Sequence, residues 1–237
     1  MNLILFEREE LKSELPSADP RAQHILRVLR RRQGDSFDAG LIDGPRGKGT
    51  LTSVTATSIS IRFEWLEEPP PLDPIELLVG LPRPQAARRI LHAMTSLGVA
   101  RLRFITADRG EAGYSSSSLW TAGEWRRHLI DGAQQAFTTR LPAVTVGQGL
   151  AEAIDSLEPG GTRLALDNYE AAQSLSKIAA VEPVTLALGP ERGWSDRERD
   201  LLRSHCFELA HLGERVLRTE TACIAAVAVV KSRLALL

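Results

Sequence analysis

Two short segments of this sequence contain most of the residues whose types and spacing could do chemistry. In the first, "LALGPERGWSDRERDLL", an apolar run ends at Leu188 and a Gly-Pro turn follows. Gly189 and Gly193 carry no Cβ, so the backbone there can approach a ligand closely. Ser195 and Glu198 have the S-x-x-E spacing of a capping box that opens a helix. The same residues also fit a tight strand-to-helix loop without a ligand, and the pattern alone leaves both interpretations open.

The second segment, "HLGERVLRTETACIAAVAVV" (211–230), is charged in its first half and apolar in its second. Thr219 can cap a helix that begins at Glu220, where the helix dipole favours a carboxylate by about 0.3–1 kcal/mol. The same dipole disfavours Arg215 and Arg218 just before that helix. Residues placed against a local electrostatic preference usually have another role. The segment therefore indicates a charged turn that faces a ligand, followed by a buried helix.

A third segment, residues 21–32, contains five arginines in twelve residues. Asp19 and Pro20 suit the start of a helix, on which Ile25, Val28 and Leu29 would share an apolar side. On another side, His24, Arg27 and Arg31 would follow one another at i, i+3 and i+7. This side is either an ordinary solvated face or a stripe that binds phosphates, and the sequence does not separate the two.

A proline-rich linker divides the elements that must position these segments. "LEEPPPLDP" (66–74) contains four prolines, which exclude a helix or central strand. Before it, alternating apolar and polar residues predict antiparallel strands of a small barrel-like β domain. After it, short apolar runs alternate with helical stretches, which predicts a mostly parallel sheet covered on both faces, with ligands at the strand ends. The expected strands are 75–81, 102–106, 143–146, 163–167, 184–188 and 207–211, and the expected helices are 84–97, 120–136, 171–180, 196–204 and 220–236.

Composition excludes several classes of protein. The 237 residues are 43% hydrophobic and 25% charged with a net charge of -1, so the chain is globular and any nucleic-acid contact must be a local patch. Cys206 and Cys223 have no metal-ligand spacing and are expected to be buried free thiols; no metal site is predicted.

The longest apolar run, 222–230, is far shorter than the ~20 residues of a membrane span. No signal peptide is recognised, and a cytoplasmic location is expected. No P-loop, dinucleotide-binding turn or nucleophile elbow is found.

Four motifs occur in a fixed order along the chain: "HILRVLR", "SLGV", "LALGPERGWS" and "LGERVLRTETA". With these motifs the chain resembles the RsmE family of 16S rRNA uridine-N3 methyltransferases, of the SPOUT class. The resemblance implies a PUA-like RNA-binding β-barrel domain over residues 1–70. Over residues 71–237 it implies an α/β methyltransferase domain with a SPOUT-type parallel sheet, tied in a deep trefoil knot. It further implies a homodimer without membrane attachment that uses S-adenosylmethionine and acts on 16S rRNA, within the small ribosomal subunit.

The resemblance also implies roles for individual residues. The cofactor is expected among three loops, 166–168, 188–193 and 212–219. Arg218 is expected to stabilise the uracil anion, and Glu220 to act as the base or to orient it. The expected cofactor-binding residues are Leu166, Leu188, Gly189, Glu191, Gly193, Leu212, Gly213, Val216, Leu217, Thr219 and Ala222. The expected RNA contacts are His24, Arg27 and Arg31 in the barrel, with Arg109 and Arg140 in the catalytic domain.

Several positions depart from the family pattern. Arg192 replaces a glycine of the second loop, which would strain the backbone if that position needs a positive φ. Ser96 and Gln134 stand where the family commonly has charged residues. These departures concern the substrate side and leave a second hypothesis open. In it the chain is a catalytically silent RNA-binding or ribosome-assembly relative that keeps the knotted dimer fold.

Overall fold

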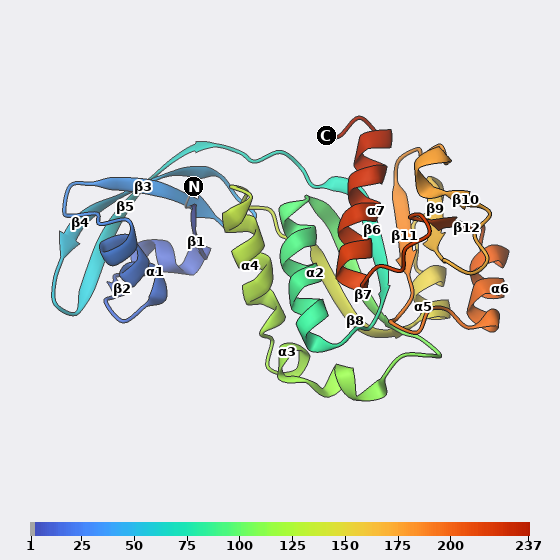
Figure 1. Ribbon diagram of the computed structural model, residues 1–237. Coiled ribbons are helices and arrows are strands. Elements are labelled where there is room, and N and C mark those ends of the chain that lie inside the picture. The colour runs from blue at the N-terminus through green and yellow to red at the C-terminus, as the bar shows by residue number, and fades with distance from the viewer. Residues whose placement is uncertain (1–2) are drawn as a thin grey trace. The chain divides into compact units, whose positions relative to one another are not determined.

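The computed structural model describes residues 3–237, which form two compact units (Figure 1). Residues 1 and 2 of the expected N-terminal domain lie outside the described residues. The first unit extends to Pro71 and also includes Ala133–Leu141; the second comprises Leu72–Gly132 and Pro142–Leu237. The linker-based boundary placed residues 133–141 in the C-terminal domain. They belong to the N-terminal unit because Thr139 Oγ1 donates a hydrogen bond to the Gly44 carbonyl and Arg140 Nη1 to the Asp43 carbonyl.

The first unit is built on a five-stranded sheet with the order β1-β3-β4-β5-β2. The strands are β1 (Ile4–Phe6), β2 (Leu15–Pro16), β3 (Ser36–Leu41), β4 (Arg46–Val54) and β5 (Ser58–Glu67). β3, β4 and β5 pair antiparallel, as the alternating pattern predicted, whereas β1 pairs parallel with β3. Phe6, Phe37, Leu51 and Ile59 point inward and form the core of this unit.

The helix of the first unit is shorter than the sequence indicated. Asp19 caps it as predicted, by accepting a hydrogen bond from the Arg21 N–H, and Pro20 is its first residue. After α1 (Pro20–Gln23) the backbone widens into a π-helix, η2 (His24–Val28), and Arg30 has a φ of 53°. Arg31 therefore lies beyond the helix, so the expected i, i+3, i+7 stripe does not form. Val28, expected on the apolar side, is exposed because the wider turn shifts the faces.

The second unit contains a seven-stranded sheet with the order β10-β12-β9-β11-β6-β7-β8. The strands are β6 (Asp73–Gly80), β7 (Val99–Thr106), β8 (Ala143–Gly149), β9 (Thr162–Leu166), β10 (Gln173–Ser174), β11 (Val184–Leu188) and β12 (Glu208–His211). Every neighbouring pair is parallel, which confirms the predicted parallel sheet. The carboxyl ends of β9, β11 and β12, which are neighbours in the sheet, therefore lie at the same edge.

The helices of this unit agree with the prediction in most places. They are α2 (Pro84–Ser96), α3 (Ser118–Thr121), α4 (Trp125–Gln135), α5 (Leu150–Asp155), α6 (Asp196–Ser204) and α7 (Thr219–Arg233). The helix expected over 171–180 is wrong: the segment forms β10, whose backbone pairs with the edge of β12, and a single 3₁₀ turn, η4 (Leu175–Lys177). Gly123, with a φ of 72°, separates α3 from α4 within the stretch expected as one helix. The short helix α5 was not predicted.

Helices cover both faces of the parallel sheet. On one face, Leu78, Ala165 and Ala187 pack with residues of α5 and α6 and with the fully buried Trp194. α2 and α7 contact each other, and α7 also contacts β11 (Figure 1). The sheet thus buries both its faces, and its carboxyl edge carries the loops that follow Leu166, Leu188 and His211.

Candidate functional site

Three loops at the carboxyl edge of the parallel sheet enclose a cavity of about 260 Å³. They follow β9, β11 and β12, and each carries one of the expected cofactor segments. The lining residues are Leu166, Asp167, Asn168 and Tyr169 from the first loop, Leu188, Gly189, Pro190, Glu191 and Gly193 from the second, and Leu212, Glu214, Arg215, Val216, Leu217, Thr219 and Ala222 from the third loop and the start of α7. Parallel sheets bind their ligands at this kind of edge.

The structure brings together the residues that the sequence grouped. Of the expected cofactor-binding residues, all except Gly213 line the cavity. Gly213 lies in the third loop with a φ of 106°, so its part is to turn the backbone rather than to form the wall. Pro190, Glu214 and Arg215 also line the cavity; they lie within the expected loops but were not among the expected cofactor-binding residues. Tyr169 lines it as well and lies one residue beyond the expected loop 166–168, so extending that loop by one residue would have found it.

The second loop is held in a tight conformation. Gly193 has a φ of 69°, which favours glycine. A Cβ on Gly80, at the end of β6, would lie 2.5 Å from the Pro190 nitrogen, so the loop packs directly on the strand. Arg192 is exposed and has no positive φ, so the arginine in place of glycine does not strain the backbone. The indole N–H of Trp194 donates to the Leu166 carbonyl over 3.1 Å and ties the second loop to the first.

The predicted capping box at the start of α6 is confirmed. Ser195 Oγ accepts a hydrogen bond from the Glu198 N–H, and Glu198 Oε2 accepts one from the Ser195 N–H at 2.8 Å. The other oxygen of the buried Glu198 accepts from the Asp108 N–H at 2.8 Å. Hydrogen bonds from Arg197 and Ser195 hold the pKa of Asp108 below its usual range. The box therefore also connects the second loop to the segment after β7.

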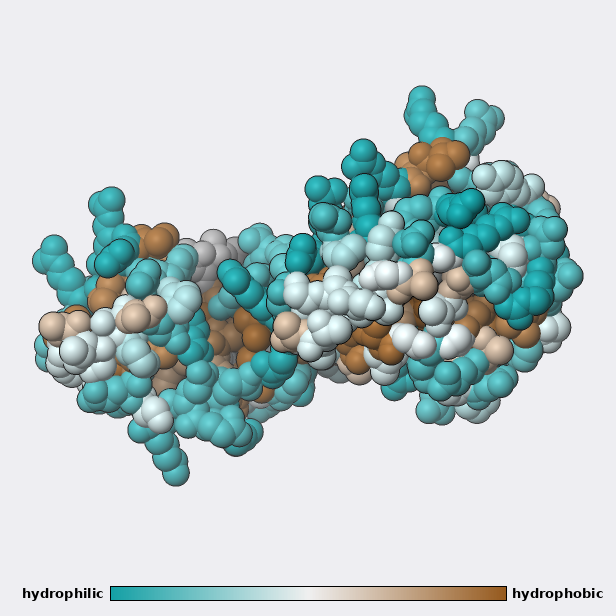
Figure 2. All heavy atoms as spheres, turned by 90° about the horizontal axis from the view of Figure 1, so that it is seen from below, coloured by the Kyte–Doolittle hydropathy of each residue, from teal (hydrophilic) through white to brown (hydrophobic). Residues whose placement is uncertain are grey.

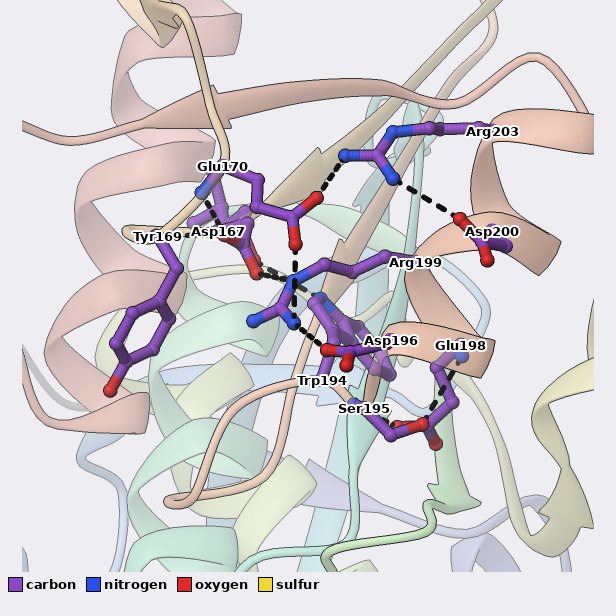
Figure 3. A network of polar contacts seen from close by, with 11 residues as sticks. Asp167, Tyr169, Glu170, Trp194, Ser195, Asp196, Glu198, Arg199, Asp200 and Arg203 are labelled. Carbon is purple, nitrogen blue, oxygen red and sulfur yellow. Dashed lines mark hydrogen bonds and ion pairs between the residues drawn. The ribbon is translucent and has the colours of Figure 1, made fainter.

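A buried ion pair fixes the first loop (Figure 3). Asp167 Oδ1 accepts hydrogen bonds from the backbone N–H groups of Tyr169 and Glu170, at 2.8 and 2.7 Å. Asp167 Oδ2 accepts from Arg199 Nε of α6 at 2.8 Å, and the two side chains are only 1% and 4% exposed. The Arg199 guanidinium lies 5.6 Å from the centre of the Tyr169 ring, which lines the cavity. One carboxylate thus sets the loop conformation and joins it to α6.

Further acids surround Arg199. Its Nη1 lies 2.9 Å from Asp196 Oδ1 and 3.6 Å from Glu170 Oε1, and Glu170 also pairs with Arg203 (Figure 3). Burial alone would lower the pKa of Arg199, but the hydrogen bond and charge of Asp167 outweigh it and keep that pKa above its usual value. Arg199 is therefore charged at neutral pH. Sequence reasoning missed this pair because its members are far apart in the chain.

The third loop leads into α7 one residue earlier than expected. α7 begins at Thr219 with Arg218 at the N-cap, so the prediction that Thr219 caps the helix is wrong. Arg218 makes no side-chain capping hydrogen bond and is exposed beside the cavity-lining Thr219. Glu220 is buried, and its Oε1 accepts a hydrogen bond from Arg89 Nη1 of α2 at 2.9 Å. Neither Arg218 nor Glu220 is part of the cavity wall.

The surroundings of Glu220 decide what its carboxylate can do. Burial would raise its pKa, but a backbone N–H and the hydrogen bond from Arg89 outweigh burial, so the pKa of Glu220 lies below its usual value. A carboxylate with a lowered pKa is a weak proton acceptor. The geometry therefore favours a positioning role for Glu220 over the role of a general base.

None of the expected RNA contacts is among the residues that line the cavity. Arg27, Arg31 and Arg109 are exposed, and His24 is half-buried on the π-helix. Arg140 belongs to the first unit rather than to the catalytic one, and it donates to the Asp43 carbonyl and lies 3.8 Å from Glu68. Its guanidinium is therefore partly used in holding residues 133–141 to the sheet.

The two cysteines are free and lie in different surroundings. Cys206 is exposed, contrary to expectation, because it lies in the turn after α6 with a φ of 63°. Cys223 is buried on α7, and burial raises the pKa of its thiol well above its usual value. Within residues 3–237, no group of three or more His, Cys, Asp or Glu side chains could hold a metal ion. Across the same residues, no helix has the length and apolar character needed to cross a membrane.

Comparison with known proteins identifies the family. Residues 68–231 match the model of the RNA methyltransferase domain family. The chain is 36% identical to the ribosomal RNA small subunit methyltransferase E of Treponema pallidum, over 97% of this chain and 90% of that protein. It is 26% identical to ribosomal RNA small subunit methyltransferase E 1 of Borreliella burgdorferi, over 99% of both chains.

Solved structures share the fold over the whole chain. A Neisseria gonorrhoeae ribosomal RNA small subunit methyltransferase E, bound to S-adenosylmethionine, has a TM-score of 0.78 at 23% identity and covers 98% of this chain and 97% of its own. A Legionella pneumophila protein in complex with S-adenosylmethionine has a TM-score of 0.82 at 24% identity, with the same coverage. Together with the family match and the identity over nearly the full length, these findings show that the chain belongs to the ribosomal RNA small subunit methyltransferase E family.

Proposed function

We propose that this protein transfers a methyl group from S-adenosylmethionine to N3 of a uridine in 16S rRNA of the small ribosomal subunit. The observation that carries the proposal is the single cavity formed by the three loops after β9, β11 and β12. Relatives named as small-subunit rRNA methyltransferases, and similar folds solved with S-adenosylmethionine, support the reaction class and the cofactor.

The cavity wall suits an adenosine-containing cofactor. Leu166, Leu188 and Leu217 supply apolar surface for an adenine ring, and the tight loops present backbone N–H and C=O groups that can read its edge. Glu191 and Glu214 offer carboxylates to the polar and cationic parts of such a molecule. When bound, S-adenosylmethionine supplies an electrophilic methyl group, and the chain's contribution is to hold the uridine in line with it.

The residues at the head of α7 have the properties that N3 methylation needs. Uracil N3 becomes nucleophilic only when its proton leaves and the resulting charge, spread over the flanking carbonyl oxygens, is stabilised. Arg218 is exposed and makes no side-chain capping hydrogen bond, and its charge helps to lower the pKa of Glu220. Its guanidinium can donate to those oxygens. Glu220, ionised and hydrogen-bonded to Arg89, is proposed as a positioning group rather than as the base.

RNA binding is proposed to rest mainly on phosphate contacts, which position the substrate without reading its sequence. The exposed Arg27, Arg31 and Arg109 remain candidates, together with His24, whereas Arg140 is a weaker one because it already holds Asp43. If the residue 24/27/31 surface binds RNA, alanine at all three positions will flatten the dependence of affinity on salt concentration. An unchanged slope would show that this surface is only solvated.

Two details of the fold are also proposals: a PUA-like barrel in the first unit and a deep trefoil knot in the second. We further propose that the protein forms a homodimer and is located in the cytoplasm. Exposed apolar side chains support the dimer: Tyr169 and Val216, at the cavity, are 78% and 85% exposed, and Ile224 of α7 is exposed as well. In Figure 2, hydrophobic atoms likewise gather in groups within a mostly hydrophilic surface. A stable dimer would cover such side chains.

The departures from the family pattern do not favour a silent relative. Ser96 Oγ donates to the His92 carbonyl and lies 3.0 Å from the Gly132 carbonyl, which joins α2 to α4. Gln134 Oε1 accepts a hydrogen bond from the Leu5 N–H within the first unit. Both side chains therefore have structural tasks, and Arg192 is unstrained.

A methyl-transfer assay tests the proposal. The purified protein is incubated with labelled S-adenosylmethionine and small subunits from a strain that lacks the gene, and reverse transcription then maps the product. An N3 methyl group blocks the pairing edge of uracil, so a new stop should appear at one uridine. A stop already present without the protein, or no labelled RNA although the donor binds, would contradict the function and favour the silent relative.

A further inference from the structure

The start of α2 contains a second group of arginines near a helix N-terminus. The segment "LPRPQAARR" (81–89) places Arg83 at the N-cap of α2, and Arg88 and Arg89 within its second turn. The first turn of α2 has no acidic residue to balance them. Cations are disfavoured near a helix N-terminus, so this placement repeats the pattern of Arg215 and Arg218 before α7.

Hydrogen bonds join α2 to the second cavity-lining loop and to α7. The Arg83 N–H donates to Glu191 Oε1 of the second loop at 3.1 Å, and Arg89 Nη1 donates to Glu220 Oε1 of α7 at 2.9 Å. At the other end, Lys231 Nζ of α7 donates to the Leu97 carbonyl at 2.8 Å. α2 and α7 therefore run parallel, and the amino-terminal ends of both lie on the side of the cavity.

The three arginines of α2 differ in what holds them. Arg83 is exposed, and within residues 3–237 its side chain makes no hydrogen bond or ion pair. Arg88 is paired with Glu124 at 3.2 Å. Arg89 has a side chain that is 63% exposed, although its partner Glu220 is only 9% exposed. A guanidinium has five N–H donors, so Arg89 is anchored at one end and has donors left that face solvent.

We propose that Arg83 and Arg89 bind phosphate groups of the RNA strand that presents the target uridine to the cavity. This inference rests on the proposed function and adds to it the surface beside the active site that grips the substrate. Arginine forks match phosphate oxygens in a bidentate way, and a fork anchored on a buried carboxylate loses less rotational freedom when it binds. Glu220 thereby acts as a positioning residue that aims Arg89 at the RNA.

The test compares Arg83→Gln, Arg89→Gln and the double variant with wild type and with a control, Arg233→Gln. Arg233 is exposed in the last turn of α7, so its substitution removes the same charge at the opposite end of the helix pair. RNA affinity is measured at several salt concentrations, and S-adenosylmethionine affinity by calorimetry. Each lost phosphate contact should lower the salt slope by about one, so the double variant should lose about two.

We expect the double variant to bind RNA on the order of 10- to 100-fold more weakly at ~0.1 M salt, with unchanged donor affinity. Arg89→Lys keeps the charge but not the fork, and should recover only part of the affinity. Arg83→Gln removes no side-chain hydrogen bond or ion pair within residues 3–237, so it tests the inference even if Arg89→Gln perturbs the fold.

Two outcomes would overturn the inference. One is a salt slope in the double variant equal to that of Arg233→Gln. The other is a loss of donor affinity instead of RNA affinity, which would assign these arginines to the donor's carboxylate. Failure of the proposed function can be told apart from these two outcomes. If wild type binds RNA and donor but transfers no methyl group, the proposed activity is contradicted. The RNA titrations then still decide the role of Arg83 and Arg89.

Discussion

Arg21 in the first unit and Arg199 in the second make the same kinds of contact in different surroundings. Arg21 pairs with Glu10 and Asp19, and its guanidinium lies 5.2 Å from the centre of the Phe6 ring. Arg199 pairs with Asp167 and lies over Tyr169. The side chain of Arg21 is 25% exposed and its partners are half-buried, whereas the Arg199 and Asp167 side chains are almost fully buried.

The difference in burial gives the two clusters different roles. The Arg21 cluster only stabilises the first unit, whereas the Arg199 cluster belongs to the site. Exposed ion pairs are screened by water and contribute about 0–1 kcal/mol each. A buried pair gains little over an apolar pair, but removing one partner leaves an uncompensated charge and costs about 3–5 kcal/mol. Asp167 also fixes the cavity-lining loop through the N–H groups of Tyr169 and Glu170. We therefore expect the Arg199 cluster to control the donor pocket and the Arg21 cluster to control only stability.

The largest effect is expected from Asp167→Ala. It leaves Arg199 buried without its closest partner and releases the first loop, so the free energy of unfolding should fall by about 3–5 kcal/mol and donor binding should be lost. Denaturant titration and calorimetry measure the two effects. The double variant Asp167→Leu with Arg199→Met removes both charges and should recover most of the stability but not the donor affinity. Full recovery of donor binding would mean that the pair has no part in the site.

Arg218→Ala is expected to have a comparable effect on catalysis without one on stability. This exposed arginine has no side-chain cap to lose, so unfolding should be unchanged. Loss of one donor to a developing anion lowers kcat by about 10²–10³-fold, or about 2.7–4 kcal/mol. Single-turnover kinetics with bound donor and RNA measure the change. Methylation at the wild-type rate would remove Arg218 from the mechanism.

Sequence reasoning predicted what local rules and motifs determine. The Asp19 cap, the capping box of Ser195 and Glu198, and the parallel strands follow from residue types at short spacing. The meeting of the three cofactor loops was expected from the family resemblance, and the cavity at the ends of β9, β11 and β12 agrees with it.

Interactions over long sequence separation could not be predicted in this way. Asp167 and Arg199 pair across 32 positions, and Arg89 and Glu220 across 131, so no periodicity links them. The segment 171–180 has helical spacing, but β12 offers it a free edge, and tertiary pairing overrides local preference. The arginine stripe failed for a different reason, because the helix widens at His24 and ends before Arg31.

Arg21→Met should have a smaller effect, confined to stability. After discounting for solvent screening, we expect a loss of about 1 kcal/mol and no change in donor affinity. The hydrogen bonds from Arg21 hold the pKa values of Glu10 and Asp19 below their usual 4.5 and 3.8. Their contribution to stability is therefore complete above about pH 5 and is lost as the pH falls through the lowered pKa values of the folded state.

Arg21→Met should weaken the loss of stability at acidic pH, because Glu10 and Asp19 then titrate closer to their usual pKa values. Unfolding followed between pH 2 and 6 for wild type and variant measures it. An equal pH dependence in both proteins would show that Arg21 does not stabilise the two carboxylates, and a loss of donor affinity would erase the distinction between the two clusters.

Ser195→Ala should loosen the helix that carries Arg199 without removing a charge. The substitution removes the cap on the Glu198 N–H and the hydrogen bond to Asp108, for about 1 kcal/mol. Because α6 then frays at the end nearest the second loop, donor affinity should fall several-fold, and amide exchange should rise in the first turn of α6. Ser204→Ala, which removes a hydroxyl at the other end of α6, should change neither. If both variants lower donor affinity equally, general loosening of α6 is responsible. If only Ser195→Ala lowers it, the second loop and the Asp167–Arg199 pair both act on the pocket through the amino-terminal end of α6.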